Sequence, residues 1–551
     1  MSASLAAINR RAVANARAWR RPAVATFITI VGLYGLAVAV GLVATALVRE
    51  PLSEGTSYYV DVARNLVSGR GLVIDAIWSY ATPPLTLPRP AFELWQPMAS
   101  FVAAVPMTVL GPSFSAAQLG YVLVGATLAP LAWLVARDTA ARLSLDARRA
   151  TTVALGVALL TAISTPLLLA AAAPDSTLPF AVLGVAACLL MPHAMAAERG
   201  AIVALGLTLA LAYLTRMEAV WLGLAFVAGS LLAGKSVART ISTSAAVAGV
   251  AALVALPWWA RNVAVFGTPL PGQLSENIFL TRNEQIFAYV DRPTLDGYLA
   301  QGVPQILANV GVALSHDAIN VLVVAAGPVA IIGLITLAAA LVRRRGLPGH
   351  GPLAMLLLSG TMTFIATSAL FPVATLWGTF EHAAGPFHVA LIVAAVVGMD
   401  AFVARVRAWR EWPRSNSWLA PAALALATLP ICALALVGAA NAVRHDAQRI
   451  DQIAAALPID HGDHGAPIIT DRPVWLSGAT GRPAIALPDE PIESLTRLAE
   501  DFGAELIVVT EPRGDLPAVL RTDEARACFS EVIGPALPVL SAVFVVNGAC
   551  R

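Results

Sequence analysis

The stretch "LSEGTSYYVDVARNLVSGRGL" spans residues 52–72 and directly follows the first long apolar run of the chain. Its apolar residues recur in pairs every four positions, which is the spacing of one face of an α-helix. Gly69 and Gly71 end this helix, because glycine readily adopts the backbone conformation that closes a helix. An amphipathic helix of this kind lies along a membrane surface and does not cross the membrane. The sequence therefore predicts that the chain turns onto a membrane surface where its first apolar run ends.

The composition agrees with a membrane protein. Of the 551 residues, 58% are hydrophobic and only 13% are charged, whereas an ordinary soluble domain carries about a quarter charged residues. Several apolar runs reach the roughly 20 residues that a helix needs to cross the hydrocarbon core of a bilayer. The net charge of +2 gives no reason to expect a nucleic-acid partner. The predicted fold class is an α-helical polytopic membrane protein.

The apolar runs predict eleven membrane spans, an odd number that places the two ends of the chain on opposite sides. The predicted spans lie near residues 24–48, 115–136, 151–173, 177–192, 200–214, 219–234, 241–259, 317–342, 353–376, 386–403 and 418–440. The apolar stretch 97–111 is too short to span, and we interpret it as re-entrant or interfacial.

Basic residues orient these spans, because Lys and Arg accumulate on the cytoplasmic side. The basic segment 9–21 precedes the first span, and further clusters lie at 137–149, 199, 235–239, 343–345 and 405–414. This pattern predicts a multi-pass membrane protein with a cytoplasmic N-terminus. We expect the membrane to be a bacterial-type plasma (inner) membrane.

The same orientation places the loops 49–96 and 260–316 and the tail outside the cytoplasm. We divide the chain into a transmembrane domain, 1–440, and a small extracytoplasmic α/β domain, 441–551. The segment 490–503 has helical spacing, whereas 504–512 and 539–548 read as strands. Cys528 and Cys550 lie in this tail, and the sequence leaves open whether they form a disulfide or two free thiols.

Glu54 opens the amphipathic helix, where the helix dipole favours a carboxylate. It is either a plain capping acid or part of a site. Tyr58 and Tyr59 follow on the apolar stripe; we expect them to contact a substrate, although an interfacial aromatic belt is the alternative. Glu93 lies between aromatic residues of a proline-rich loop. It either faces a sugar or is a simple loop acid.

Three further segments carry charges at the outer ends of spans. Asp175 follows the span 151–173 and either shares a site with Glu54 or caps the next helix. Arg216 and Glu218 interrupt an apolar stretch, either as an ion pair or with Arg216 as a phosphate ligand. Arg261 closes the span 241–259, and for it phosphate binding competes with interfacial anchoring.

His382 adjoins Glu381 near an outer helix end, and His388 follows six residues later. A histidine with an adjacent acid is typical of metal binding or proton transfer, but an interfacial histidine without such a role is the alternative. The sequence indicates no organic cofactor and leaves a divalent metal open.

Several of these segments together resemble a known family. The motif acid–x–x–x–Tyr–Tyr–x–x–x–Ala–Arg–Asn–Leu–x–x–Gly–Arg–Gly at 54–71, "LTRMEAVW" at 214–221, "LPWWARNVAVFGTPLP" at 256–271 and the tail segment "TDRPVWLSGATGRPAIALP" at 470–488 are similar to segments of the multispanning GT-C glycosyltransferases. The likeness is to the protein O-mannosyltransferase and aminoarabinose-transferase group and its bacterial glycosyltransferase 39-like relatives.

The resemblance implies a GT-C-like fold and transfer of a sugar, with inversion, from a polyprenyl-phosphate-linked donor. The acceptor would be an extracytoplasmic protein, lipid or glycan. It also implies that Glu54 acts as base or acceptor-positioning acid, that Asp175 assists it, and that Arg216 or Arg261 binds phosphate. Ser53 stands where members of the group commonly carry an aspartate. The main alternative is a polytopic transporter or lipid flippase, for which an internal two-fold repeat is typical but is not visible in the sequence.

Overall fold

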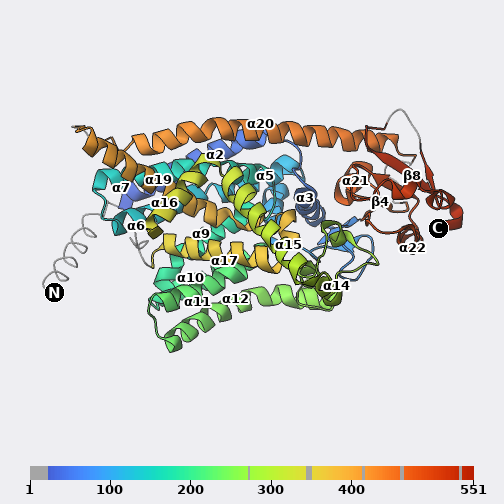
Figure 1. Cartoon of the computed structure of the whole chain (residues 1–551), viewed down its shortest axis with the longest axis horizontal. Coiled ribbons are helices and arrows are strands. Elements are labelled where there is room, and N and C mark those ends of the chain that lie inside the picture. Colours follow the sequence, from blue (N-terminus) through green and yellow to red (C-terminus); the bar gives the residue numbers. More distant parts are fainter. Residues whose placement is uncertain are drawn as a thin grey trace.

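The computed structural model describes residues 23–270, 273–342, 350–412, 416–458, 465–532 and 537–550. The basic segment 9–21, the arginines at 343–345 and Arg414 lie outside these residues. A bundle of long helices forms most of the molecule, and a smaller region of mixed strands and helices sits at one end of it (Figure 1).

Helices account for most of the described chain. The α-helices are α2 (Ala23–Leu47), α3 (Glu54–Val67), α4 (Met98–Leu110), α5 (Phe114–Gly125), α6 (Leu128–Arg142), α7 (Ala147–Ile163), α8 (Thr165–Ala172), α9 (Thr177–Met195), α10 (Arg199–Thr215), α11 (Ala219–Leu232), α12 (Val237–Phe266), α13 (Gln273–Asn277), α14 (Leu295–Ala300), α15 (Gly302–His316), α16 (Gly327–Val342), α17 (Pro352–Leu370), α18 (Thr379–Ala383), α19 (Gly385–Trp409), α20 (Leu419–Ala456), α21 (Pro473–Thr480) and α22 (Ile492–Phe502). A π-helical segment, η2 (Asp317–Val324), continues α15, and short 3-10 turns include η1 (Asn283–Phe287) and η3 (Ala374–Trp377).

Within the described residues, eight helices are long and apolar enough to cross a membrane, or nine when the bent pair α7 and α8 is taken as one span. The predicted count of eleven requires two of the four shorter apolar helices α4, α10, α11 and α16 to cross as well. The sequence-based prediction counted α10 and α11 as spans. With 17 and 14 residues, these two helices are only about 26 and 21 Å long. They are therefore shorter than a hydrocarbon core of about 30 Å.

Two segments differ from the sequence-based expectation. The predicted span 317–342 is not one regular helix, because a break at 325–326 separates η2 from α16. The helix before this break begins at Gly302, within the predicted loop 260–316, and the stretch Gly302–Val324 is itself long and apolar enough to span. The sequence does carry a stop at this break, because Gly327, with φ +61°, is followed by Pro328.

Small residues allow the bundle helices to approach closely, as is common in membrane proteins. A Cβ atom on Gly333 of α16 would lie 2.5 Å from the backbone oxygen of Leu391 on α19. On the other side of the same contact, a Cβ on Gly398 would lie 1.9 Å from Oγ1 of Thr336. The backbones of α16 and α19 therefore pack at a distance that only glycine permits at these positions.

The smaller region is built on a six-stranded sheet with the order β2-β5-β4-β6-β8-β7. Its strands are β2 (Ala76–Ile77), β4 (Ile468–Thr470), β5 (Ala484–Ala486), β6 (Leu506–Val509), β7 (Phe529–Glu531) and β8 (Ala542–Val546); β1 (Val73–Ile74) and β3 (Arg89–Pro90) form a separate antiparallel pair. The predicted helix at 490–503 and the predicted strands at 504–512 and 539–548 are all present, as α22, β6 and β8. The expected small α/β architecture of the tail is thus confirmed.

The first loop belongs structurally to this sheet. β2 pairs in parallel with β5, which lies some four hundred residues later in the chain. A second connection is α20, which runs unbroken from the helix bundle to the sheet region, from Leu419 to Ala456 (Figure 1). Residues on both sides of position 440 therefore share one helix. A disulfide joins Cys528 to Cys550 near the end of the chain.

Candidate active site

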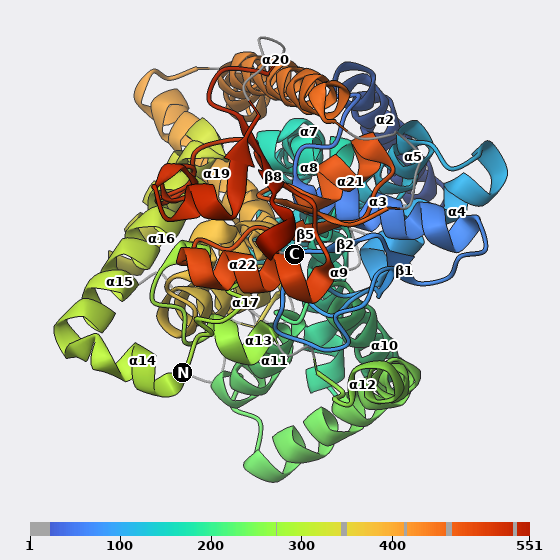
Figure 2. The ribbon, with the colours of Figure 1, turned by 90° about the vertical axis from the view of Figure 1, so that its right-hand side faces the viewer.

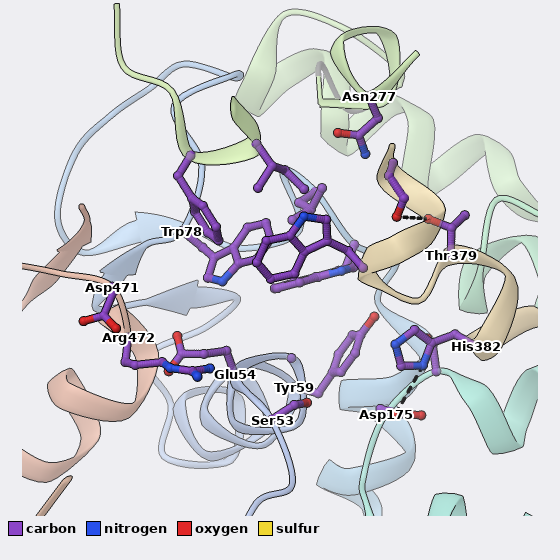
Figure 3. A pocket seen from close by; sticks show the side chains of 18 of the residues that line it. Ser53, Glu54, Tyr59, Trp78, Asp175, Asn277, Thr379, His382, Asp471 and Arg472 are labelled. Carbon is purple, nitrogen blue, oxygen red and sulfur yellow. Dashed lines mark hydrogen bonds and ion pairs between the residues drawn. The ribbon is translucent and has the colours of Figure 1, made fainter. Parts of the chain in front are cut away.

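A cavity of about 380 Å³ lies between the helix bundle and the sheet region. It is lined by side chains from both, and Figure 3 shows part of this lining. Five of the residues predicted from sequence meet there: Glu54, Tyr59, Asp175, Arg216 and His382. We refer to this space as the polar cavity.

Glu54 occupies the first turn of α3, but its carboxylate does not cap that helix. Ser53 is the N-cap residue, with a side chain that accepts a hydrogen bond from the backbone N–H of Thr56. The Glu54 carboxylate instead accepts hydrogen bonds from the backbone N–H groups of Val474, at 2.9 Å, and Trp475, at 2.8 Å. These groups belong to the first turn of α21, where N–H groups have no partner within the helix. Glu54 thus joins the first loop to the sheet region, which lies over α3 when viewed end-on (Figure 2).

The surroundings of Glu54 change its acidity. Burial raises the pKa of Glu54 to about 7, because removal from water disfavours the charged form more than the two N–H donors and Arg472 favour it. A carboxyl group with such a pKa can both accept and release a proton near neutral pH.

Asp175 lies on the opposite side of the polar cavity from Arg472, near His382 (Figure 3). One carboxylate oxygen accepts a hydrogen bond from the backbone N–H of Thr177, at 2.6 Å, so Asp175 does stabilise the start of α9. The other oxygen lies 3.6 Å from Nδ1 of His382, which also contacts Oγ1 of Thr177 at 2.7 Å. Both interpretations of Asp175, as cap and as site residue, are therefore compatible with its position.

Arg216 lies in the break between α10 and α11. Its guanidinium donates hydrogen bonds to Oγ of Ser176, at 2.7 Å, and to the carboxylate of Glu218, at 2.6 Å. The predicted ion pair is present. Arg216 also lines the polar cavity, and the N–H of its buried Nε has no hydrogen-bond partner.

Aromatic rings form one wall of the polar cavity. The ring centres of Tyr59 and Trp95 are 5.9 Å apart, those of Trp95 and Trp78 are 5.1 Å apart, and those of Trp78 and Phe287 are 4.7 Å apart. Trp377 continues the row, 5.5 Å from Phe287. Flat apolar faces of this kind are well suited to the C–H faces of a sugar ring. We call these five residues the aromatic wall.

A second cavity, of about 360 Å³, adjoins the first and shares Tyr59, Trp95 and Arg216 with it. Its apolar lining includes Met217, Val220 and Trp221, before and within α11, and Leu370 and Phe371 at the end of α17. Val220 and Leu370 in this lining are 51% and 49% exposed. On the flank of a membrane bundle such exposed apolar side chains face lipid, so we call this space the lipid-side cavity.

Three predicted residues lie outside the lining of both cavities. The hydroxyl of Tyr58 donates to the carboxylate of buried Glu93, which in turn lies 3.3 Å from the guanidinium of buried Arg89. Arg261 donates to the backbone oxygen of Ala91, at 2.8 Å, and stacks on Trp258. The structure therefore places Tyr58, Glu93 and Arg261 in contacts that hold the first loop. Glu218 lines the lipid-side cavity.

The sheet region contributes residues that the sequence interpretation missed. Trp78 follows β2, Asp471 and Arg472 follow β4, and Glu511 and Arg513 follow β6. The strands β2, β5, β4 and β6 are parallel, and ligands of open α/β sheets bind beyond the carboxyl ends of parallel strands. The available signal was thus the polar segment after each strand-like run, "TDR" at 470–472 and "TEPR" at 510–513.

No group of three or more His, Cys, Asp or Glu side chains arranged to hold a metal ion occurs in the described part of the chain. Asp175 and His382 are the two side chains of ligand type that approach each other in the polar cavity.

A bundle of membrane-spanning helices, an extended first loop and a terminal α/β region define the fold as that of the GT-C membrane proteins. ArnT from Cupriavidus metallidurans in the apo state has this architecture, with a TM-score of 0.56 over 96% of this chain and 99% of that chain, at 15% identity. The same ArnT bound to undecaprenyl phosphate matches with a TM-score of 0.53 over 95% and 98% of the two chains, again at 15% identity. No protein-family model and no curated protein sequence matches this chain. The expected GT-C-like fold is confirmed, and at this level of identity the likeness is one of fold.

Proposed function

We propose that this protein transfers a sugar from a polyprenyl-phosphate-linked donor to an acceptor at the extracytoplasmic surface of the membrane. The observation that carries the proposal is the junction of the two cavities at Arg216. A polyprenyl phosphate needs an apolar space for its chain and a cation for its head group. The lipid-side cavity offers the first, and the guanidinium of Arg216 offers the second.

The sugar and the acceptor would meet in the polar cavity. With the phosphate at Arg216, the sugar extends along the aromatic wall toward Glu54. Glu54 takes the proton of the acceptor hydroxyl, the hydroxyl oxygen attacks the anomeric carbon, and the bond to the phosphate oxygen breaks. Arg216 neutralises the charge left on the polyprenyl phosphate. General-base assistance of this kind contributes roughly 10²–10⁴-fold to a rate.

Asp175 and His382 would act on the donor side of the same cavity. Their separation of 3.6 Å allows Asp175 to orient the imidazole. Tyr59 lines both cavities, so its ring would border the sugar where it leaves the phosphate. Tyr58, Glu93 and Arg261 have no direct part in this proposal, because none of them lines either cavity.

The proposed orientation places the polar cavity outside the cytoplasm. The disulfide between Cys528 and Cys550 supports this orientation, because disulfides persist in oxidising compartments. The matching structure of ArnT contains undecaprenyl phosphate, which supports a lipid-phosphate donor for a chain of the same fold. The acceptor would be a protein, a lipid or a glycan. No feature of the described residues favours a transporter.

A transfer assay in membranes tests the proposal. Membranes that contain the protein would be supplied with radiolabelled mannose, glucose or arabinose on polyprenyl phosphate, and label in lipid, glycan and protein fractions would be counted. We expect transfer from at least one donor, and a loss of about 10²–10⁴-fold in the Glu54→Gln variant. The matched control is Glu50→Gln, which removes an exposed acid only four residues away. Absence of transfer from every donor would reject the proposed function.

A further inference from the structure

The end of the polar cavity that lies farthest from the lipid-side cavity is formed by residues that follow β4 and β6. Four of them are charged: Asp471, Arg472, Glu511 and Arg513. Arg472 is paired, because its guanidinium lies 3.4 Å from the carboxylate of Glu511. Glu511 also lies 3.4 Å from Arg449. Two guanidinium groups thus share the carboxylate of Glu511, whereas the carboxylate of Asp471 accepts hydrogen bonds from the backbone N–H and the hydroxyl of Thr510.

Arg513 differs from its neighbours because no carboxylate of the described residues lies within ion-pair distance of its guanidinium. The guanidinium lies 4.1 Å from the centre of the Phe287 ring, on the aromatic wall. One nitrogen donates a long hydrogen bond of 3.4 Å to the backbone oxygen of Leu487. Its Nε is buried without any hydrogen-bond partner.

The position of Arg513 is fixed by the backbone. Its N–H donates to the backbone oxygen of Leu516, at 3.2 Å, and its own oxygen accepts from the N–H of Leu516, at 2.9 Å. These two bonds close a tight turn, in which Gly514 has φ +55°. The side chain of Arg513 therefore lies between this turn and the ring of Phe287.

Arg513 is half-buried, and a cation that is partly removed from water is unfavourable when it has no anionic partner. Burial lowers the pKa of Arg513, since the loss of water outweighs the attraction of more distant carboxylates such as Asp471 and Asp489. Such a group is stabilised when an anion enters the cavity and takes up the unused donors. Guanidinium groups bind carboxylates and phosphates particularly well, because their planar donors match two oxygens at once.

The phosphate of the proposed donor is not a suitable partner for Arg513. Arg216 lines both cavities, whereas Arg513 lines the polar cavity alone. Between them lies the aromatic wall, in which Arg513 contacts Phe287 and Tyr59 adjoins the lipid-side cavity. A donor with its phosphate at Arg216 would reach the Arg513 end only with its sugar, so a group bound at Arg513 belongs to the acceptor.

We propose that Arg513 binds an oxyanion of the acceptor, a carboxylate or a phosphate ester, and that this site selects an anionic acceptor. The assignment of the anion to the acceptor rests on the proposed function, whereas the anion site itself does not. Arg472 would assist as the second cation at this end of the cavity.

Binding measurements on the purified full-length protein test the site with three probes that share one sugar ring. These probes are glucose, glucuronate, which carries a carboxylate, and glucose 6-phosphate. We expect at least one of the two anions to bind at least about tenfold more tightly than glucose. The anion that binds more tightly identifies the chemistry of the acceptor group. Binding of both anions no better than glucose would overturn the proposal.

Variants then assign the anion to a residue. Arg513→Gln should abolish the preference for the anion, and Arg513→Lys should restore part of it, because lysine keeps the charge but loses the planar pair of donors. Arg526→Gln removes an exposed arginine of the same region and should change nothing. If Arg513 only supports Phe287 by stacking, the Arg513→Gln variant will keep the preference for the anion.

A second ligand separates this site from the donor site. Undecaprenyl phosphate should bind equally well to the wild type and to Arg513→Gln, and more weakly to Arg216→Gln. The anionic sugar should bind equally well to the wild type and to Arg216→Gln, and more weakly to Arg513→Gln. Loss of both ligands in Arg513→Gln would overturn a distinct anion site. Failure of undecaprenyl phosphate to bind any form of the protein would count against the proposed function. The comparison of anionic and neutral sugars would still test the anion site at Arg513.

Discussion

Glu54 is the residue for which the structure predicts a specific pH dependence. A base acts in its deprotonated form, and burial raises the pKa of Glu54 to about 7. We therefore expect the rate of sugar transfer to fall about tenfold per unit as the pH decreases below about 7, and to level off above it. The pH profile of transfer measures this directly. Ordinary glutamate, with a pKa of about 4.3, would give a flat profile over the same range.

The control for this profile is again Glu50→Gln, which leaves the contacts of Glu54 with α21 intact. Its midpoint should stay near that of the wild type. A wild-type rate that does not change between about pH 5.5 and 8 would contradict the role of Glu54 as the base.

Sequence reasoning at the residue scale found candidate charged residues of the helix bundle more easily than it found their partners. Glu54, Asp175, Arg216 and His382 interrupt apolar or amphipathic patterns, so each is visible in the sequence. Which of two adjacent tyrosines faces the cavity was not visible, because neighbouring helix positions differ by only about 100° in direction. The N–H partners of Glu54 lie 420 and 421 positions away, and no local pattern encodes such a contact.

At the scale of elements, the contact between α16 and α19 makes a prediction about stability. Gly333→Ala would place a Cβ atom 2.5 Å from the backbone oxygen of Leu391. A backbone atom cannot move aside as a flexible side chain can, so the two helices must separate. We expect a loss of about 1–3 kcal/mol in the free energy of unfolding, measured as a lower midpoint of thermal unfolding in detergent.

Gly249→Ala is the matched control, because nothing lies within 4 Å of a Cβ atom built at this position of α12. There alanine should be neutral or stabilising by up to about 1 kcal/mol, since it has the higher helix propensity. Equal effects of the two substitutions on the free energy of unfolding would show that the close approach of α16 to α19 does not determine stability at Gly333.

The helices and strands also differ in how well the sequence pattern predicts them. Some apolar helices, such as α2 and α9, were predicted within a few residues, as were α22, β6 and β8, whereas the span 317–342 and the end of α20 were not. β2 has only two residues and no period, so its place at the edge of the sheet could not be foreseen. That place matters for the site: it carries Trp78 to the carboxyl edge of the parallel strands, beside Asp471 and Glu511.

On the scale of the whole molecule, the sheet region lies at one end of the helix bundle (Figure 1). This region lines part of the polar cavity, which adjoins the lipid-side cavity, and it carries the disulfide. The proposed function requires this end to face outward, because an acceptor must reach the polar cavity from the same side on which the donor presents its head group. The direction of the molecule in the membrane is therefore the property on which the rest of the proposal depends.

The cysteines of the chain permit a clean test of this direction. Cys188 and Cys432 are buried, and Cys528 and Cys550 are joined to each other, so an impermeant thiol reagent should react weakly with the wild type. Ser68→Cys creates an exposed thiol at the C-terminal end of α3, the helix whose first turn carries Glu54, and Ala238→Cys creates one at the start of α12. In intact cells we expect labelling of the first variant alone. The second should react only after permeabilisation, because the turn before α12 lies toward the opposite end of the bundle. The reverse pattern would place the polar cavity in the cytoplasm and would rule out transfer to an extracytoplasmic acceptor.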